Sequence, residues 1–106
     1  MKLGIILNTN DPESAWNAFR LGNAALKQAH EVGIFLLGKG VECEIIQTET
    51  FDVPGELNSF KQNGGRLLAC GTCLVSRKQK TRACNVSTMD GLLKIIAESD
   101  KVVSIG

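Results

Sequence analysis

The stretch that decides the fold reads Leu67-Leu68-Ala69-Cys70-Gly71-Thr72-Cys73. Its first four residues are apolar, which is typical of a short strand that is covered on both faces, as in a parallel sheet. Gly71 ends this run, and the residues from 71 to 78 predict a short helix. Cys70 is therefore expected where a strand passes into a helix, at the edge of the sheet where α/β proteins bind ligands.

Apolar runs and helical patterns alternate outward from this stretch to both ends of the chain. Strands are predicted over 3–7, 32–37, 67–70 and 101–105, and helices over 12–30, 53–60, 71–78 and 89–97. Asp11 and Pro12 are typical of the start of a helix, and residues 87–90 form a capping sequence for the last one. That last helix has an apolar stripe made of Met89, Leu92, Leu93, Ile96 and Ala97. Residues 41–50 fit either a short helix or an extended segment, and residues 77–86 are polar and irregular.

This alternation predicts one three-layer α/β domain over residues 1–106, with a mainly parallel sheet of four or five strands and helices on both faces. A chain of 106 residues has the length of a single domain. The sequence has four Phe, one Trp and no Tyr, so the core is expected to consist mainly of Leu, Ile, Val and Ala. A domain this small has a narrow margin of stability and often gains from oligomerisation, so an oligomer is expected.

Composition and charge argue against several classes of protein. The formal net charge is +1, so binding to a membrane or directly to nucleic acid through overall charge is not expected. The apolar run over 3–7 is too short for a signal peptide or a membrane span, which points to the cytoplasm. Four cysteines in that reducing compartment are expected to be free thiols or ligands rather than a disulfide framework.

Cys70 is the reactive group that the predicted sheet edge offers. At the start of a helix, unpaired amide N–H groups and the helix dipole favour a thiolate. Cys73 follows at a spacing that places both thiols on one side of a helical turn, and Cys84 lies in a loop that can fold back over this edge. Gly71 allows a substrate to approach the backbone closely, and Arg77 adds positive charge.

Further candidate residues surround Cys70. Asn8 and Asn10 follow the first strand and are expected at the same edge of the sheet as Thr72, whose amide is a candidate donor to an anionic group. Residues 8–12 contain no glycine, so a phosphate-binding loop is not predicted, and no cofactor is expected.

Simpler interpretations of these residues are also open. A metal site is not predicted, because Cys70, Cys73 and Cys84 offer three ligands and no fourth is evident. Cys70 itself can be a small buried hydrophobic residue, and Cys43 is expected to be one. His30, the only histidine, is expected to be a surface or capping residue rather than a catalytic base.

Two stretches of opposite charge suggest a further role. Residues 77–82 include Arg77, Lys78, Lys80 and Arg82, and residues 42–56 include Glu42, Glu44, Glu49, Asp52 and Glu56 without a basic residue. Such stretches are usually solvated surface. The alternative is that they pair head to tail between subunits and close a ring.

Several segments of the chain resemble the DsrE/DsrF-like proteins. They are the opening strand and helix, Gly40-Val41, residues 68–77, Val86-Ser87-Thr88-Met89 and Ser99-Asp100-Lys101-Val102-Val103. The similarity spans essentially the whole chain and implies a flavodoxin-like α/β fold that assembles as a homotrimer or homohexamer. Sulfur-relay members, such as the TusD-like subunits, carry sulfur as a persulfide on a cysteine near the end of the third strand, some seven residues before an arginine. Cys70, followed by Arg77, falls on that position.

The residues and the resemblance together predict a cytoplasmic sulfur-handling protein. The Cys70 thiolate is expected to take sulfane sulfur from a donor protein and pass it to an acceptor protein, with the amides of Gly71 and Thr72 stabilising the anionic sulfur. Cys73 departs from the pattern of the relay subunits, because a second thiol one turn later can release sulfide and leave a disulfide. Two alternatives therefore stay open: a redox dithiol of Cys70 with Cys73 or Cys84, and an oligomeric binding module without chemistry.

Overall fold

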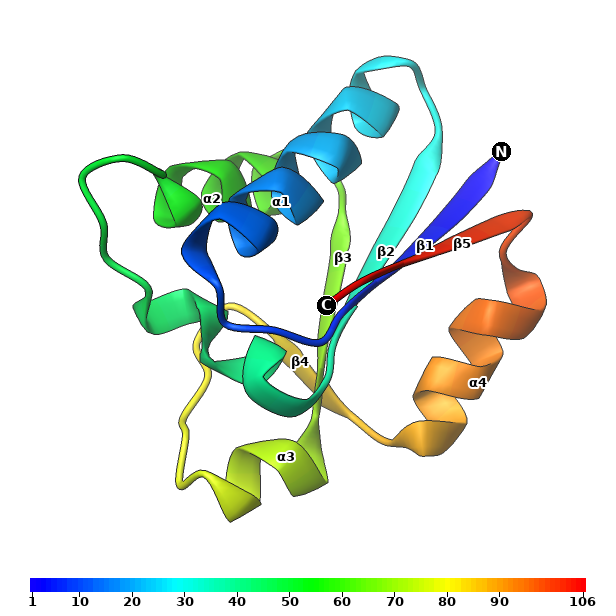
Figure 1. Ribbon diagram of the computed structural model, residues 1–106. Helices are drawn as coiled ribbons and strands as arrows, with labels where there is room; N and C mark the ends of the chain where they lie inside the picture. Colours follow the sequence, from blue (N-terminus) through cyan, green and yellow to red (C-terminus); the bar gives the residue numbers. More distant parts are fainter.

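The computed structural model describes all 106 residues, and its chain alternates strands and helices (Figure 1). The strands are β1 (Lys2–Leu7), β2 (Glu31–Leu36), β3 (Arg66–Cys70), β4 (Asn85–Ser87) and β5 (Lys101–Ile105). The helices are α1 (Pro12–Lys27), the 3-10 helix η1 (Gly38–Ile45), α2 (Val53–Gln62), α3 (Gly71–Ser76) and α4 (Met89–Glu98).

The five strands form one sheet in the order β4-β3-β2-β1-β5, and every neighbouring pair is parallel. The prediction of a mainly parallel sheet of four or five strands is thus confirmed, and the sheet has no antiparallel pair. β4 begins within the segment 77–86 that the sequence predicts to be irregular. It has only three residues and pairs with β3 alone, from Leu68↔Asn85 to Cys70↔Ser87. A strand this short does not display the alternating period by which strands are recognised.

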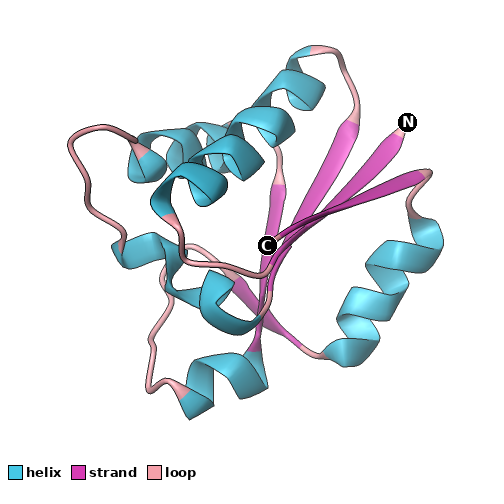
Figure 2. Cartoon of the chain, in the orientation of Figure 1, coloured by secondary structure: helices cyan, strands magenta, loops and turns pink.

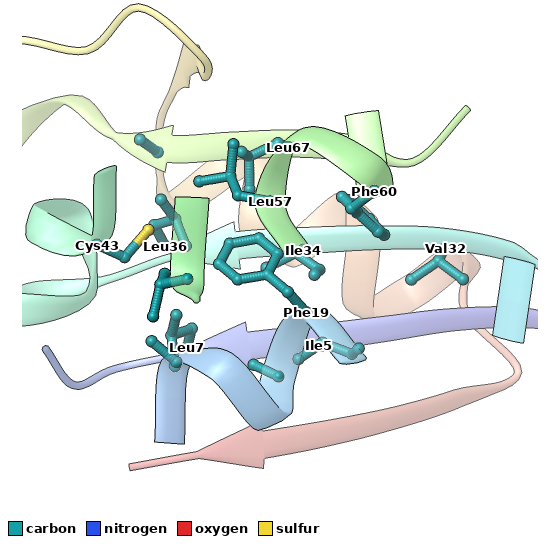
Figure 3. Close-up of a cluster of buried hydrophobic side chains, with 14 of the residues drawn as sticks. Ile5, Leu7, Phe19, Val32, Ile34, Leu36, Cys43, Leu57, Phe60 and Leu67 are labelled. Carbon is teal, nitrogen blue, oxygen red and sulfur yellow. The ribbon is translucent and has the colours of Figure 1, made fainter. Parts of the chain in front are cut away.

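Helices cover both faces of the sheet, as predicted (Figure 1, Figure 2). α1 and α2 pack on one face, where 18 buried residues form the main core around the rings of Phe19 and Phe60 (Figure 3). α4 lies on the other face, over a smaller cluster of Phe35, Cys70, Leu92 and Ile95. Successive residues of a strand point to opposite faces, which is why the end of β3 contributes Ala69 to one cluster and Cys70 to the other.

Side-chain caps begin the helices where the sequence predicts them. Asp11 accepts a hydrogen bond from the amide of Ser14 at 2.9 Å, and Pro12 occupies the first turn of α1. Thr88 accepts a hydrogen bond from the amide of Gly91 at 3.3 Å at the start of α4. These bonds satisfy amide groups that have no partner within the helix, so they define where each helix starts.

Two helices end earlier than the sequence predicts. α1 stops at Lys27 rather than near residue 30, and Ala29 just beyond it adopts a left-handed φ of 66°. α3 stops at Ser76 rather than at residue 78, where Lys78 has a φ of 50°. A left-handed residue reverses the direction of the chain and ends a helix.

None of the helices is long and apolar enough to cross a membrane.

The segment over residues 41–50, which the sequence leaves open, lies partly in η1 and becomes extended at Ile46. η1 starts against the carboxyl end of β1, so closely that a Cβ on Gly40 would overlap the carbonyl oxygen of Leu7. Gly38 has a φ of 56°, in the region that favours glycine. These two glycines bring the start of η1 to the edge of the sheet at which Cys70 lies.

The apolar stripe of α4 is only partly buried. Leu92 faces the sheet together with Ile95, whereas Met89, Leu93 and Ile96 of the predicted stripe are exposed, and so is Ala97. α4 connects β4 to β5, the two edges of the sheet, so one helix of ten residues lies over a face of five strands. The sheet below buries only one side of the stripe, which leaves an apolar face toward solvent.

Candidate functional site

Cys70 occupies the strand-to-helix junction that the sequence predicts for it. It is the last residue of β3 and the N-cap residue of α3. Its side chain lies in the cluster under α4, beside Phe35 and Leu92, and the residue is only 3% exposed. The Cys70 thiol is therefore near the carboxyl edge of the sheet but is covered by other side chains and not open to solvent.

Cys73 is the second thiol of the site. It is the third residue of α3 and packs against the same cluster as Cys70, but it is half-buried. Residues three apart in a helical turn are neighbours, and the Cys70 thiol is close enough to change the ionisation of Cys73. Both cysteines are free thiols. The structure thus brings together the two cysteines that their spacing predicts to be neighbours.

The surroundings of Cys73 act on its proton in opposite directions. Burial raises the pKa of Cys73, and the neighbouring Cys70 thiol raises it further. The backbone N–H of Gly38, which donates a hydrogen bond to Cys73 Sγ at 3.3 Å, and the charge of Arg77 both lower it. The raising effects are larger, so the pKa of Cys73 lies above its ordinary value of 9.0 and the thiol is protonated at neutral pH.

Arg77 links the end of α3 to the loops that follow β1 and β2. Its Nε forms an ion pair with Glu42 Oε1 at 3.3 Å, and Asn10 Nδ2 donates a hydrogen bond to Glu42 Oε2 at 3.1 Å. Asn8 lies against η1, where its Oδ1 occupies the space that a Cβ on Gly38 would need. The predicted residues Asn8, Asn10 and Arg77 therefore gather around η1, which also contacts Cys73.

Gly71 and Thr72 form the first turn of α3. Gly71 packs closely against β4, because a Cβ there would lie 3.1 Å from Val86 Cγ1 and 3.4 Å from the carbonyl oxygen of Ser87. Thr72 is exposed. α3 has six residues instead of the predicted eight.

The structure does not bring Cys84 to the thiol pair. The pairing Leu68↔Asn85 places Cys84 level with Leu67, about 10 Å from Cys70 along β3 at 3.3 Å per residue. Alternation along the strand turns Cys84 toward the opposite face of the sheet, where it packs against the main core. A disulfide between Cys70 and Cys84, which the sequence leaves open, does not fit this arrangement.

Cys84 instead belongs to a cluster around Glu44, a residue that the sequence assigns only to the acidic stretch. The Glu44 carboxylate accepts hydrogen bonds from the Thr81 hydroxyl, the amides of Arg82 (3.0 Å) and Ala83 (3.3 Å), and Cys84 Sγ (3.3 Å). Burial raises the pKa of Glu44, but these hydrogen bonds together outweigh it and lower the pKa below its ordinary value. Burial also raises the pKa of Cys84 to about 12, so this thiol is protonated at neutral pH.

Most of the acidic stretch is used within the chain. Four of its five acidic residues have hydrogen-bond or ion-pair partners in the same chain: Glu42, Glu44, Asp52 and Glu56. Local sequence offers no signal for these pairings, because Glu42 and Glu44 bind residues 32 or more positions away. Most of these acidic side chains are therefore already paired within the chain, which argues against the suggested pairing of the two charged stretches between subunits.

A hollow of about 490 Å³ lies away from the thiol pair. It opens at the opposite end of the sheet, where the strands begin, and its lining includes Lys2, His30 and Arg66. The residues that line this hollow include neither Cys70 nor Cys73.

The fold and the site together define a class: a small α/β protein with an all-parallel sheet and a thiol pair at its carboxyl edge. The sequence pattern of the DsrE/DsrF-like family matches residues 1–105, and the chain belongs to this family. The family resemblance inferred from the sequence is thus confirmed.

Relatives and solved structures agree with this assignment. An uncharacterised protein of Methanocaldococcus jannaschii is 32% identical over 114 residues, which cover 98% of this chain and 99% of the relative. An uncharacterised protein of Methanopyrus kandleri is 31% identical over 98 residues, which cover 86% of this chain and 81% of the relative. A conserved protein of unknown function from Bacteroides thetaiotaomicron has a similar structure, with a TM-score of 0.81 at 21% identity, over 98% of this chain and 94% of that one. A protein of unknown function from Methanobacterium thermoautotrophicum gives a TM-score of 0.77 at 11% identity, over 97% of both chains. At these identities, the two structures show that the fold is shared.

Proposed function

We propose that this protein takes up sulfane sulfur as a persulfide on Cys70 and passes it to an acceptor. The observation that carries the proposal is a free thiol at the carboxyl end of β3, one helical turn from a second thiol, in a chain of the DsrE/DsrF-like family. The resemblance of residues 68–77 to sulfur-relay members supports the same position. Donor and acceptor are sulfur-carrying proteins, as that resemblance implies.

Uptake of sulfur at Cys70 is a thiol exchange. The Cys70 thiolate attacks the outer sulfur of a donor persulfide, R–S–SH, and forms a new S–S bond. The S–S bond of the donor breaks, and the donor leaves as the thiolate R–S⁻, so atoms and charge balance without any other oxidant or reductant. Arg77, held by Glu42 at the end of α3, places a positive charge close to the thiol pair.

The burial of Cys70 restricts which donors can react. Cys70 is only 3% exposed, whereas its neighbour Cys73 is half-buried, so a donor sulfur approaches Cys70 from the side of Cys73. A donor protein meets this requirement when its persulfidated cysteine lies at the tip of a flexible loop. A broad, rigid surface that carries its sulfur in a recess does not.

The proposal includes an assembly and a location. The exposed apolar residues of α4, Met89, Leu93 and Ile96, supply a surface for contact between copies of the chain, which supports the predicted homotrimer or homohexamer. The cytoplasm is the proposed location, because thiols are kept reduced there.

A redox dithiol is a second candidate function, and the contact between the Cys70 and Cys73 thiols favours it. Under this alternative the pair cycles between dithiol and disulfide without carrying sulfur. Mild oxidation in the absence of any sulfur donor is then expected to produce a Cys70–Cys73 disulfide, which a peptide map detects. A reduced pair after that treatment contradicts the alternative.

The test of the proposed function uses variants in which Cys73 is absent, so that any persulfide on Cys70 persists. Cys73→Ser, Cys73→Ser/Cys84→Ser and Cys70→Ser/Cys73→Ser are incubated with a low-molecular-mass thiol persulfide and weighed intact. The first two are expected to gain about 32 Da, the mass of one sulfur atom, and the variant without Cys70 to gain nothing. Equal gains in all three variants would falsify Cys70 as the acceptor.

A further inference from the structure

The thiols of Cys70, at the end of β3, and of Cys73, in α3, lie too close together for a persulfide on one of them to be isolated from the other. Cys70 is the N-cap residue of α3 and belongs to the cluster under α4, and Cys73 is the third residue of α3 and packs against that cluster. We propose that Cys73 attacks the Cys70 persulfide and releases its sulfur as hydrosulfide, so that the protein reduces persulfides rather than only carrying them. This inference rests on the proposed function, since it needs sulfur on Cys70.

The geometry of α3 permits a bond between the two sulfurs. Residues three apart in a helix have Cβ atoms about 5–6 Å apart, so a modest adjustment brings them to the separation of a disulfide. Leu74 is the only buried residue within α3, and Val75 is 78% exposed. Because α3 buries so little apolar surface of its own, it can adjust at low cost in packing.

The proposed step balances without an external oxidant. The persulfide Cys70–S–S⁻ and the thiol Cys73–SH react to give the disulfide Cys70–S–S–Cys73 and HS⁻. A bond forms between the two Sγ atoms, the bond between Cys70 Sγ and the sulfane sulfur breaks, and the proton of Cys73 leaves with the departing sulfur. The sulfane sulfur is reduced, and the two cysteine sulfurs are oxidised.

Leaving-group chemistry decides between this step and simple transfer of sulfur to Cys73. An attacking thiol can reach either sulfur of a persulfide, and the exchange is faster when the leaving group is the conjugate base of the stronger acid. Hydrogen sulfide is a stronger acid than a cysteine thiol, so attack on Cys70 Sγ with departure of hydrosulfide is favoured. Cys73 also carries the proton that the departing sulfur needs, because it is protonated at neutral pH.

Turnover requires a dithiol reductant of the thioredoxin kind. Such a dithiol attacks Cys73 Sγ, the more exposed of the two sulfurs, and releases Cys70 as a thiolate. A second exchange frees Cys73 and leaves the reductant as a disulfide. The reaction that follows in sequence must be one that consumes hydrosulfide.

The experiment uses full-length wild type, Cys73→Ser and the control Cys84→Ser, each reduced, freed of reductant and given one equivalent of a thiol persulfide without oxygen. Intact mass and hydrosulfide, trapped as its bimane adduct, are measured together. Wild type and Cys84→Ser are expected to lose about 2 Da, as in disulfide formation, and to release hydrosulfide. Cys73→Ser is expected to keep about 32 Da of added mass and to release hydrosulfide at least about tenfold more slowly.

The other outcomes separate the two proposals. If wild type keeps the added sulfur as Cys73→Ser does, the resolving role of Cys73 is overturned while the proposed function stands. If Cys73→Ser gains no mass and wild type releases no hydrosulfide, the proposed function itself fails. A disulfide that maps to Cys43 and Cys84 instead of Cys70 and Cys73 also overturns the inference.

Discussion

At the scale of single residues, the pKa of Cys73 is set by groups that act in opposite directions. Burial and the Cys70 thiol hold its proton, whereas the amide of Gly38 and the charge of Arg77 favour its thiolate. Attack on a persulfide requires the thiolate, and in the proposed step Cys73 forms it by giving its proton to the terminal sulfur of the persulfide, so a higher pKa of Cys73 is expected to slow the release of hydrosulfide. Of these influences on the pKa of Cys73, the charge of Arg77 is the easiest to remove by mutation. It is carried by a side chain, unlike the backbone amide of Gly38, and it lies outside the apolar cluster.

Replacing Arg77 with Gln is expected to raise the pKa of Cys73 further, because it removes the positive charge. Hydrosulfide release at neutral pH should slow by about two- to fivefold, the size expected for an exposed charge interaction, and the pH profile should move to higher pH. The control is Lys80→Gln, which removes a nearby exposed charge that is not among the causes acting on Cys73. A slower rate with an unmoved pH profile would indicate that Arg77 acts through the structure of α3 and not through its charge.

At the scale of elements, η1 organises the carboxyl edge of the sheet. It contributes the Gly38 amide to Cys73, Glu42 to Arg77 and Glu44 to the segment over 81–84. These contacts hold α3 and the loop that follows it, although that loop has little regular structure of its own. The segment before β4 therefore depends on a carboxylate from a distant part of the chain.

The hold of Glu44 on residues 81–84 is expected to weaken in acid. Because the pKa of Glu44 in the folded protein is lowered from 4.5, its stabilising effect is complete above that pH and is lost as the pH falls through the lower folded-state value. Amide protection of Arg82 and Ala83, measured by hydrogen exchange, should fall in that range. Glu44→Gln should show low protection and little pH dependence.

Glu49→Gln is the matched control for this prediction, because Glu49 is an exposed acid of the same stretch and holds no part of the loop. Its amide protection should follow that of wild type at every pH. If Glu44→Gln protects Arg82 and Ala83 as well as wild type does at neutral pH, the carboxylate is not what anchors this segment.

On the scale of the whole molecule, the two faces of the sheet are covered unequally. α1 and α2 bury 18 residues on one face, together with η1, whereas α4 alone crosses the other. The result is an apolar surface around Leu93, which is 63% exposed. An exposed apolar surface on a small domain favours association with another chain.

Leu93→Lys is expected to shift the protein from an oligomer toward monomers, because it introduces a charge into this apolar surface. Sedimentation velocity measures the change, and Lys94→Gln, on the next residue of α4, is the control that should keep the assembly of wild type. Since Leu93 contributes little to the core of its own chain, the folded monomer should persist. A wild-type protein that sediments as a monomer at all salt concentrations contradicts the predicted oligomer.

Local patterns in the sequence were sufficient to predict the α/β alternation, the helix caps at Asp11 and Thr88, the strand-to-helix junction at Cys70 and the proximity of Cys73 to Cys70. These features depend on residues a few positions apart, whose spacing has a direct meaning in a helix or strand. The sequence also carried the family resemblance, because segments along the whole chain contribute to it.

Only the tertiary structure decided the partners of distant residues. It places Cys84 and Cys70 on opposite faces of the sheet, and it brings Glu42 and Arg77 of the same chain together as an ion pair. It also left Leu93 exposed although the helix periodicity is compatible with burial. The physical reason is the same in each case: the order of the strands determines which distant segments meet and how much of a helix is covered, and local periodicity carries no information about that order.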